Sequence, residues 1–221
     1  MSCKTNSGIA SRNIQRKLDN IQNNPIDFSL SPENMYLWGF LWADAHFCES
    51  RKRVTLEITE EDFCEIEHVL PFYYNKYYRT RENRKPQASA VSTREDLFKF
   101  FMSNGYEYRD CPSAKITKSK NNHYWFRGLI DGDGCWYIGK CKQFTISSSL
   151  FQDWTFFTDM LDNIGVKKYS VKRQPTENIG YSYVRICNKK GLHKLYDFLY
   201  PNGYDFGLQR KFDKANEIKL L

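Results

Sequence analysis

The chain of 221 residues repeats itself, and this internal repeat is the feature that most constrains its fold. The segment LFKFF at 97–101, followed by NGY at 104–106, is echoed by LHKLY at 192–196 and NGY at 202–204. The offset between the copies grows slightly from the first landmark to the second, as insertions in loops would make it grow. We therefore expect two similar halves.

A nine-residue motif aligns the two halves: LWGFLWADA occupies 37–45, and FRGLIDGDG occupies 126–134. In both copies a glycine precedes an aspartate by five positions, and a second small residue follows the glycine by four. Residues i and i+4 share one face of a helix, so each copy presents a smooth stripe that another backbone can approach closely. The predicted helix interface consists of Gly39, Ala43, Gly128 and Gly132.

Packing of the two motif helices would bring Asp44 and Asp133 together at the C-terminal ends of those helices. The helix dipole is negative there, so a pair of carboxylates needs a positive partner. These carboxylates and the helix-end carbonyls, at Ala45 and Gly134, form a hard-oxygen set suited to Mg²⁺, with Mn²⁺ as a substitute. The pattern thus predicts one catalytic metal centre shared by the two halves.

The two halves have similar expected orders of elements, and the second has one more strand after its motif helix. In the first half the periodicity predicts a helix over 32–44, a strand around 54–58, a helix over 63–74, two strands within 77–92 and a helix over 93–104. In the second it predicts a helix ending at 133, strands over 135–140 and 142–149, a helix over 150–163, strands over 167–174 and 181–187, and a helix over 189–199.

Three segments follow from this order: an N-terminal polar arm over 1–30, a first repeat over 31–118 and a second repeat over 119–221. Ile14, Leu18 and Ile21 have helical spacing, so the arm is expected to contain a short helix.

The expected strands alternate between an apolar face and a polar, hydrogen-bonding face, and a basic turn lies within the first half. Such a mixed face can contact both phosphates and base edges. The candidate DNA-binding residues are Arg53, Thr55, Arg79, Arg81, Arg84, Lys85, Lys140, Lys142, Gln143, Thr145, Ser147, Lys168, Lys172, Gln174, Tyr183 and Arg185.

Composition agrees with a nucleic-acid partner and excludes other classes. The net charge is +7 and 16% of the residues are aromatic, which favours a polyanionic partner. The seven cysteines are scattered without a CxxC pair, which favours a reducing compartment and argues against structural zinc. No apolar run approaches the ~20 residues needed to cross a bilayer, so we expect an intracellular protein without a membrane partner.

The paired motifs resemble those of the LAGLIDADG homing endonucleases, and the region over 31–221 is similar to the single-chain, two-repeat form of that family. The string RGLIDGDG at 127–134 is a close match, whereas the first copy has Trp42 in place of the family's first aspartate and Ala45 in place of its glycine. The resemblance implies an α+β fold of two pseudo-symmetric αββαββα repeats with saddle-shaped antiparallel sheets. It also implies that Asp44 and Asp133 bind the metal.

Members of this family place basic residues beside the metal. For the first half the resemblance suggests Lys115, in the segment that leads to the second motif. For the second half it suggests the stretch LQRK at 208–211, where Gln209 stands at the position usually held by lysine and Lys211 or Arg210 can substitute.

The resulting hypothesis is a monomeric, magnesium-dependent endonuclease that hydrolyses both strands of a long double-stranded DNA target. Halves that differ in sequence imply an asymmetric target, since each half reads its own half-site. By resemblance, the enzyme would promote the mobility of an intron or be a free-standing mobile gene.

Two alternatives remain open. One is a binding protein of the same fold, either a maturase that binds intron RNA or a DNA-binding regulator without cleavage activity, and Gln209 favours it. The other is a structural protein in which the motif helices only join two domains.

Overall fold

The computed structural model describes residues 25–71, 74–80, 85–107, 109, 111–148, 152–174 and 181–221. Most of the polar arm over 1–30, including the helix expected around Ile14 to Ile21, lies outside these residues. Arg81 and Arg84 of the basic turn also lie outside them.

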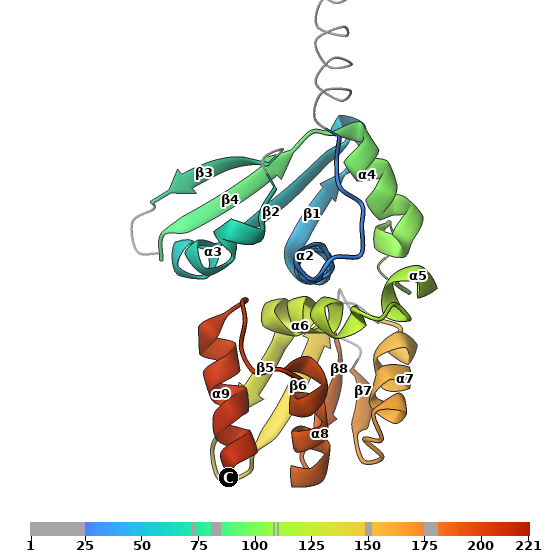
Figure 1. The fold of residues 1–221 in the computed structure, drawn as a ribbon, viewed down its shortest axis with the longest axis vertical. Helices are drawn as coiled ribbons and strands as arrows, with labels where there is room; N and C mark the ends of the chain where they lie inside the picture. Colours follow the sequence, from blue (N-terminus) through green and yellow to red (C-terminus); the bar gives the residue numbers. More distant parts are fainter. Residues whose placement is uncertain are drawn as a thin grey trace, which may run out of the picture.

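Two repeats of the same order form the molecule (Figure 1). The first consists of α2 (Pro32–Asp44), β1 (Ala45–Cys48), β2 (Arg53–Thr59), α3 (Glu60–Ile66), β3 (Asn75–Arg79), β4 (Gln87–Ser92) and α4 (Glu95–Phe101). After the short α5 (Ala114–Thr117), the second consists of α6 (Asn122–Asp133), β5 (Gly134–Tyr137), β6 (Gln143–Ser148), α7 (Thr155–Asn163), β7 (Ser170–Gln174), β8 (Tyr181–Ile186) and α8 (Lys189–Leu199). The helix α9 (Gln209–Leu220) ends the chain.

Each repeat contains a four-stranded antiparallel sheet, with the orders β1-β2-β4-β3 and β5-β6-β8-β7. The two orders are equivalent, so the repeats share one topology. This confirms the expected α+β fold of two αββαββα units.

The local sequence explains where α2 begins and which face of β2 is buried. The Ser31 hydroxyl accepts a hydrogen bond from the backbone N–H of Asn34 and caps α2, while Pro32 occupies the first helical position. Along β2, Val54 and Leu56 are fully buried, whereas Glu57 on the other face is exposed. The sheet therefore has one core face and one outward face.

The helix expected over 63–74 has different ends. It begins earlier because the Thr59 hydroxyl caps it at the N–H of Asp62, and its first turn is acidic, which suits the positive end of the helix dipole. It continues as a 3-10 turn to Val69 and stops before Pro71, which cannot extend a helix.

Two elements of the second half also start later than expected. The helix α7 begins at Thr155, whose N–H donates a hydrogen bond to the Asp153 carboxylate. The carbonyl of Lys168 accepts a hydrogen bond from the Asn188 side chain, so Lys168 precedes β7 and does not belong to it.

The helix α9 was not expected from the sequence. Its buried stripe consists of Lys211, Ala215 and Ile218, which have the i, i+4, i+7 spacing of a helix face. A lysine and an alanine occupy two of the three positions, so hydrophobic periodicity does not reveal the stripe.

The helices α2 and α6 lie against each other at the centre of the molecule, with one sheet on either side (Figure 1). A Cβ atom added to Gly39 would overlap the carbonyl of Trp125, and one added to Gly128 would overlap the carbonyl of Tyr36. One added to Gly132 would overlap the side chain of Ala43. The two backbones thus touch where the small residues lie, and larger side chains cannot fit there.

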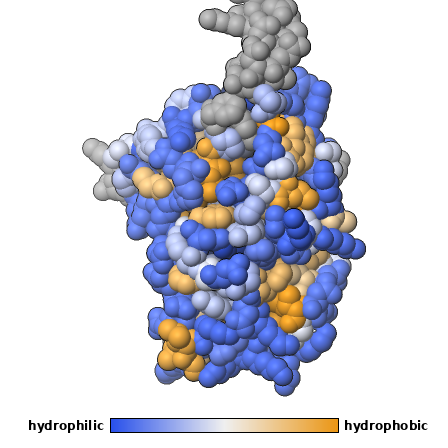
Figure 2. All heavy atoms as spheres, viewed as in Figure 1, coloured by the Kyte–Doolittle hydropathy of each residue, from blue (hydrophilic) through white to orange (hydrophobic). Residues whose placement is uncertain are grey.

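The outer surface is mainly polar, as Figure 2 shows for one face of the molecule. Within the described part of the chain, no helix combines the length and the apolar character that a membrane crossing requires.

We expect Gly39→Ala to lower the free energy of unfolding by about 1–3 kcal/mol, because the added methyl group forces the two backbones apart. Urea unfolding followed by circular dichroism measures this change. An alanine in an open helix position stabilises instead of destabilising, so the sign of the effect is diagnostic. Lys214→Ala, on the exposed side of α9, is the control, with a change within ~0.5 kcal/mol. Unchanged or increased stability of Gly39→Ala would contradict the close packing.

Candidate active site

Asp44 and Asp133 are the last residues of α2 and α6. Each helix ends there because the next residue, Ala45 or Gly134, has an extended backbone and begins a strand. A Cβ atom on Gly132 would lie 2.8 Å from Oδ2 of Asp44, so the Asp44 carboxylate lies against the backbone of the other helix. The close packing of α2 and α6 thus brings the two aspartates into one centre.

The two carboxyl groups share an unfavourable electrostatic environment. Burial raises the pKa of Asp133 to about 7, and the charge of Asp44 contributes to this rise. Neighbouring protein atoms also desolvate Asp44 and raise its pKa, although the residue keeps a solvent-exposed edge. Both groups therefore favour a nearby positive charge and remain accessible from solvent.

Two cationic side chains lie beside this pair. The Arg109 guanidinium donates hydrogen bonds to the carbonyls of Ala43, at 3.2 Å, and of Ala45. The Lys211 ammonium donates to the carbonyl of Gly134. Each cation thus holds the end of one motif helix, and the two contacts are related by the repeat.

Both cations interact electrostatically with the aspartates. Burial lowers the pKa of Arg109, and the charges of Asp133 and Asp44 act in the opposite direction. Burial likewise lowers the pKa of Lys211. In turn, Lys211 and Arg109 lower the pKa of Asp44 against the effect of burial.

The sequence did not identify Arg109 as a site residue. It follows α4 in a left-handed conformation, with φ of 52°, and its carbonyl accepts a hydrogen bond from the Gln152 side chain. Arg109 follows the first NGY triplet by three residues and Lys211 follows the second by seven, so the repeat places both in corresponding regions but does not by itself identify Arg109.

Asp131 positions the helix that carries Lys211. Its buried carboxylate accepts hydrogen bonds from the Tyr36 hydroxyl, at 2.8 Å, and from the N–H of Leu208, at 3.0 Å. Burial raises the pKa of Asp131 to about 6. Leu208 directly precedes α9, so this contact fixes the start of that helix.

The first motif has Trp42 at the position equivalent to Asp131. The Trp42 ring is buried and packs against the rings of Trp125 and Tyr106, with centroids 5.7 and 4.8 Å away. The repeats therefore share the motif-ending aspartates and differ in how the neighbouring segment is held.

The other residues of the LQRK stretch face the first repeat. The backbone N–H of Gln209 donates to Glu65 at 2.8 Å, and its side-chain amide donates to Asp213 at 2.7 Å. Arg210 forms two hydrogen bonds of 2.7 Å with Asp62 of α3. Of this stretch, Lys211 is the residue whose cationic side chain bonds to the end of a motif helix.

Lys115 occupies an exposed position on α5. The charges that shift the pKa of Asp133 come from Asp44, Arg109 and Lys211, and Lys115 is not among them. In the first repeat the cation next to the aspartates is thus Arg109.

The register of each sheet gathers many of the candidate DNA-binding residues on its outward face. In the first sheet this face includes Arg53, Thr55 and Arg79, together with Tyr77 and Ser89, and a hollow of about 450 Å³ opens on it. In the second it includes Gln143, Thr145, Ser147, Lys172, Tyr183 and Arg185.

The Arg185 guanidinium packs over the Tyr183 ring on the second sheet. The Arg185 guanidinium lies 4.7 Å from the Tyr183 ring centroid, and its Nε donates to the Thr145 hydroxyl at 3.4 Å. Tyr183 is only 7% exposed, so its ring supports Arg185 and offers little surface of its own.

The remaining candidates lie at the ends of strands or in the connections between them. Lys140 and Lys142 are in the connection between β5 and β6, and Lys168 precedes β7. Lys85 precedes β4, with its ammonium 3.5 Å from Glu61. Gln174 is the last residue of β7, where its backbone pairs with Tyr181.

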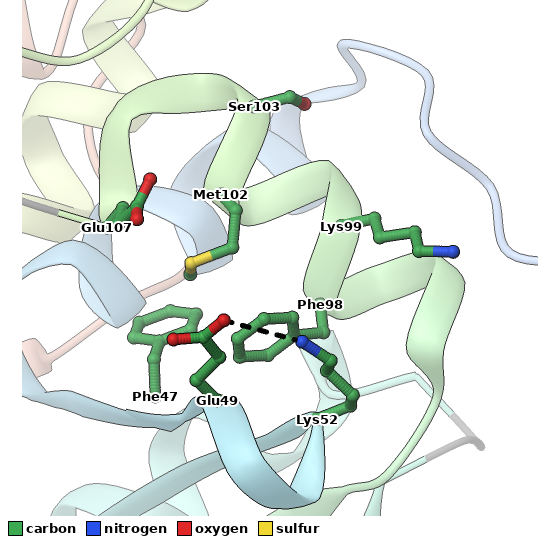
Figure 3. A pocket seen from close by; sticks show the side chains of 8 residues that line it. All are labelled: Phe47, Glu49, Lys52, Phe98, Lys99, Met102, Ser103 and Glu107. Carbon is green, nitrogen blue, oxygen red and sulfur yellow. Dashed lines mark ion pairs between the residues drawn. The ribbon is translucent and has the colours of Figure 1, made fainter.

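Another hollow, of about 640 Å³, lies between α4 and the turn after β1 (Figure 3). Its wall combines the Phe98 ring with an ion pair between Lys52 and Glu49, whose charged atoms are 3.7 Å apart. Neither Asp44 nor Asp133 lines it, so it is separate from the candidate active site.

Comparisons with known proteins give matches in structure and none in sequence. No family model matches the chain, and no curated protein matches it in sequence. The homing endonuclease I-WcaI bound to its DNA recognition sequence matches with a TM-score of 0.58 at 12% identity, over 97% of this chain and 94% of that chain.

Two further structures have the same fold. The meganuclease I-SmaMI, bound to uncleaveable DNA, matches with a TM-score of 0.54 at 12% identity, over 86% of this chain and 91% of that one. Full-length DUF199/WhiA from Thermatoga maritima matches with a TM-score of 0.55 at 12% identity, over 88% of this chain and 62% of that one. The protein thus has the two-repeat fold found in the LAGLIDADG homing endonucleases I-WcaI and I-SmaMI.

Proposed function

We propose that this protein is a site-specific endonuclease that uses a divalent metal to hydrolyse both strands of a double-stranded DNA target. The observation that carries the proposal is the paired centre, in which each repeat supplies one aspartate and one cation. The structures of I-WcaI and I-SmaMI bound to DNA support a DNA partner for this fold. Because one chain contains both halves of the centre, it is expected to act as a monomer.

The donor set at the paired centre fits Mg²⁺. Burial raises the pKa of both carboxyl groups. A bound cation would stabilise their ionised forms and so offset the effect of burial. The carbonyls of Ala45 and Gly134 already accept hydrogen bonds, but a carbonyl oxygen has a second lone pair. Among the described residues, no group of three or more His, Cys, Asp or Glu side chains is placed so that it could hold a metal ion, so water and phosphate would complete the shell.

Each group of the centre has a distinct task in this proposal. Asp44 and Asp133 would hold Mg²⁺, or Mn²⁺ in its place. When bound, the metal supplies activation of water and stabilisation of the leaving oxygen. Arg109 and Lys211 stabilise the negative charge that develops on the phosphate, since both are fixed beside the carboxylates before substrate arrives.

A DNA-binding protein of the same fold without cleavage activity is the second candidate. It is favoured by Gln209, whose side chain pairs with Asp213 and does not provide a cation to the centre. A maturase that binds intron RNA is a further form of this candidate.

The decisive experiment incubates the protein with a library of double-stranded DNA targets and Mg²⁺, and sequences the cut ends. We expect the native chain to cut both strands, and Asp44→Asn and Asp133→Asn each to lose double-strand cleavage by a factor of at least ~100 while binding is retained. Asp159→Asn, which changes an exposed aspartate of α7, serves as the control and should cut normally. Binding of DNA by the native chain without cutting would instead support the second candidate.

The cations give a second prediction. Arg109→Met and Lys211→Met should each reduce the cleavage rate by about 10²–10³-fold, because each removes a charge fixed next to the reacting phosphate. Lys115→Met should change the rate by less than about twofold, since Lys115 is exposed on α5. Single-turnover cleavage assays measure these rates. A large loss in Lys115→Met together with an active Arg109→Met would show that the cation of the first repeat is Lys115.

A further inference from the structure

The described strand residues place one acidic side chain on the outward faces of the two sheets. Among the described strand residues, the charged Lys, Arg, Asp and Glu side chains on these faces are Arg53, Glu57, Arg79, Lys172 and Arg185. Within the described strands, Glu57 is therefore the single carboxylate on faces whose other charged side chains are basic. If this surface meets DNA, as the proposed function requires, Glu57 would lie close to a polyanion.

Among the residues that the structure describes, Glu57 has no partner that would explain its presence on this face. The residue is exposed, and within the described part of the chain it forms no ion pair or hydrogen bond with Arg53, Arg79 or any other group. Its cross-strand neighbour is Ser89, which in turn pairs with Tyr77. None of the described residues occupies this carboxylate, so it can accept a hydrogen bond from a ligand.

Base chemistry indicates which ligand group fits. An unpaired carboxylate near phosphates weakens binding, unless it accepts a hydrogen bond from a base. In the major groove, which a β-sheet ribbon can enter, the amino group N4 of cytosine is the donor that Glu accepts. Adenine offers N6 beside the acceptor N7, which repels a carboxylate, and guanine and thymine offer acceptors.

We propose that Glu57 is a specificity-determining residue that selects cytosine at one position of the half-site contacted by the first sheet. This inference rests on the proposed function, because it requires DNA on the outward face.

The register of the first sheet locates this position within the target. The pairing of β1 with β2 ends at Ala45 and Leu56, so Glu57 lies one residue beyond it, at the end of the strand where α2 delivers Asp44. Arg53 lies at the opposite, hairpin end of β2. The selected cytosine is therefore in the inner part of the half-site, towards the cleavage centre.

The test selects binding sites from a randomised double-stranded DNA library, using the full chain in a Ca²⁺ buffer so that binding is measured without the need for cleavage. The native protein should prefer cytosine over other bases at one inner position by about fivefold to a hundredfold. Glu57→Gln should lose this preference and shift towards adenine, because an amide can pair with N6 and N7. All other positions of the selected site should keep their preferences.

Glu217→Gln is the matched control, since it removes the same charge from an exposed position on α9 and should leave the selected site unchanged. An unchanged cytosine preference in Glu57→Gln would overturn the inference. So would tighter binding of all sequences alike, because Glu57 would then only repel phosphates. Failure of the native chain to bind DNA at all would overturn the proposed function itself, which separates the two outcomes.

Discussion

The contact between the backbones of α2 and α6 is the constraint on which the rest of the structure depends. Gly39 and Gly128 each face a carbonyl of the opposite helix, and no side chain fits between them. Since each helix also covers the core face of its own sheet, this contact fixes the two sheets relative to each other. It also determines that the helices end side by side, which is why Asp44 and Asp133 share one centre.

This arrangement has an electrostatic cost that the chain partly offsets with its own cations. Two carboxylates at the negative ends of two helices repel each other and the helix dipoles. Arg109 and Lys211 bond to the carbonyls at those helix ends, where they oppose both effects. The same placement that stabilises the free protein also puts positive charge where a phosphate would react, so structure and proposed chemistry use the same groups.

The sequence predicted those parts of the fold that depend on local patterns and on the repeat. The spacing of Gly39 from Asp44 and of Gly128 from Asp133 is enough to place both aspartates on packed helices. The sequence alone could not identify Arg109, because a left-handed residue in a loop carries no periodic signal. The role of Arg109 depends on its contacts with Ala43 and Ala45. The helix α9 was missed for a related reason: its buried stripe begins with Lys211, a charged residue that is buried for its contact with Gly134.

The shared centre is tested most directly by the pKa of the Asp133 carboxyl group, measured by ¹³C NMR titration in metal-free buffer for the native chain and for Asp44→Asn. In the native chain this pKa should be raised to about 7, because the group is buried and faces the charge of Asp44. In Asp44→Asn it should fall, since the repulsion is gone, yet stay above its ordinary value because burial remains. An Asp133 pKa that is identical in the two proteins would show that the aspartates do not share one centre.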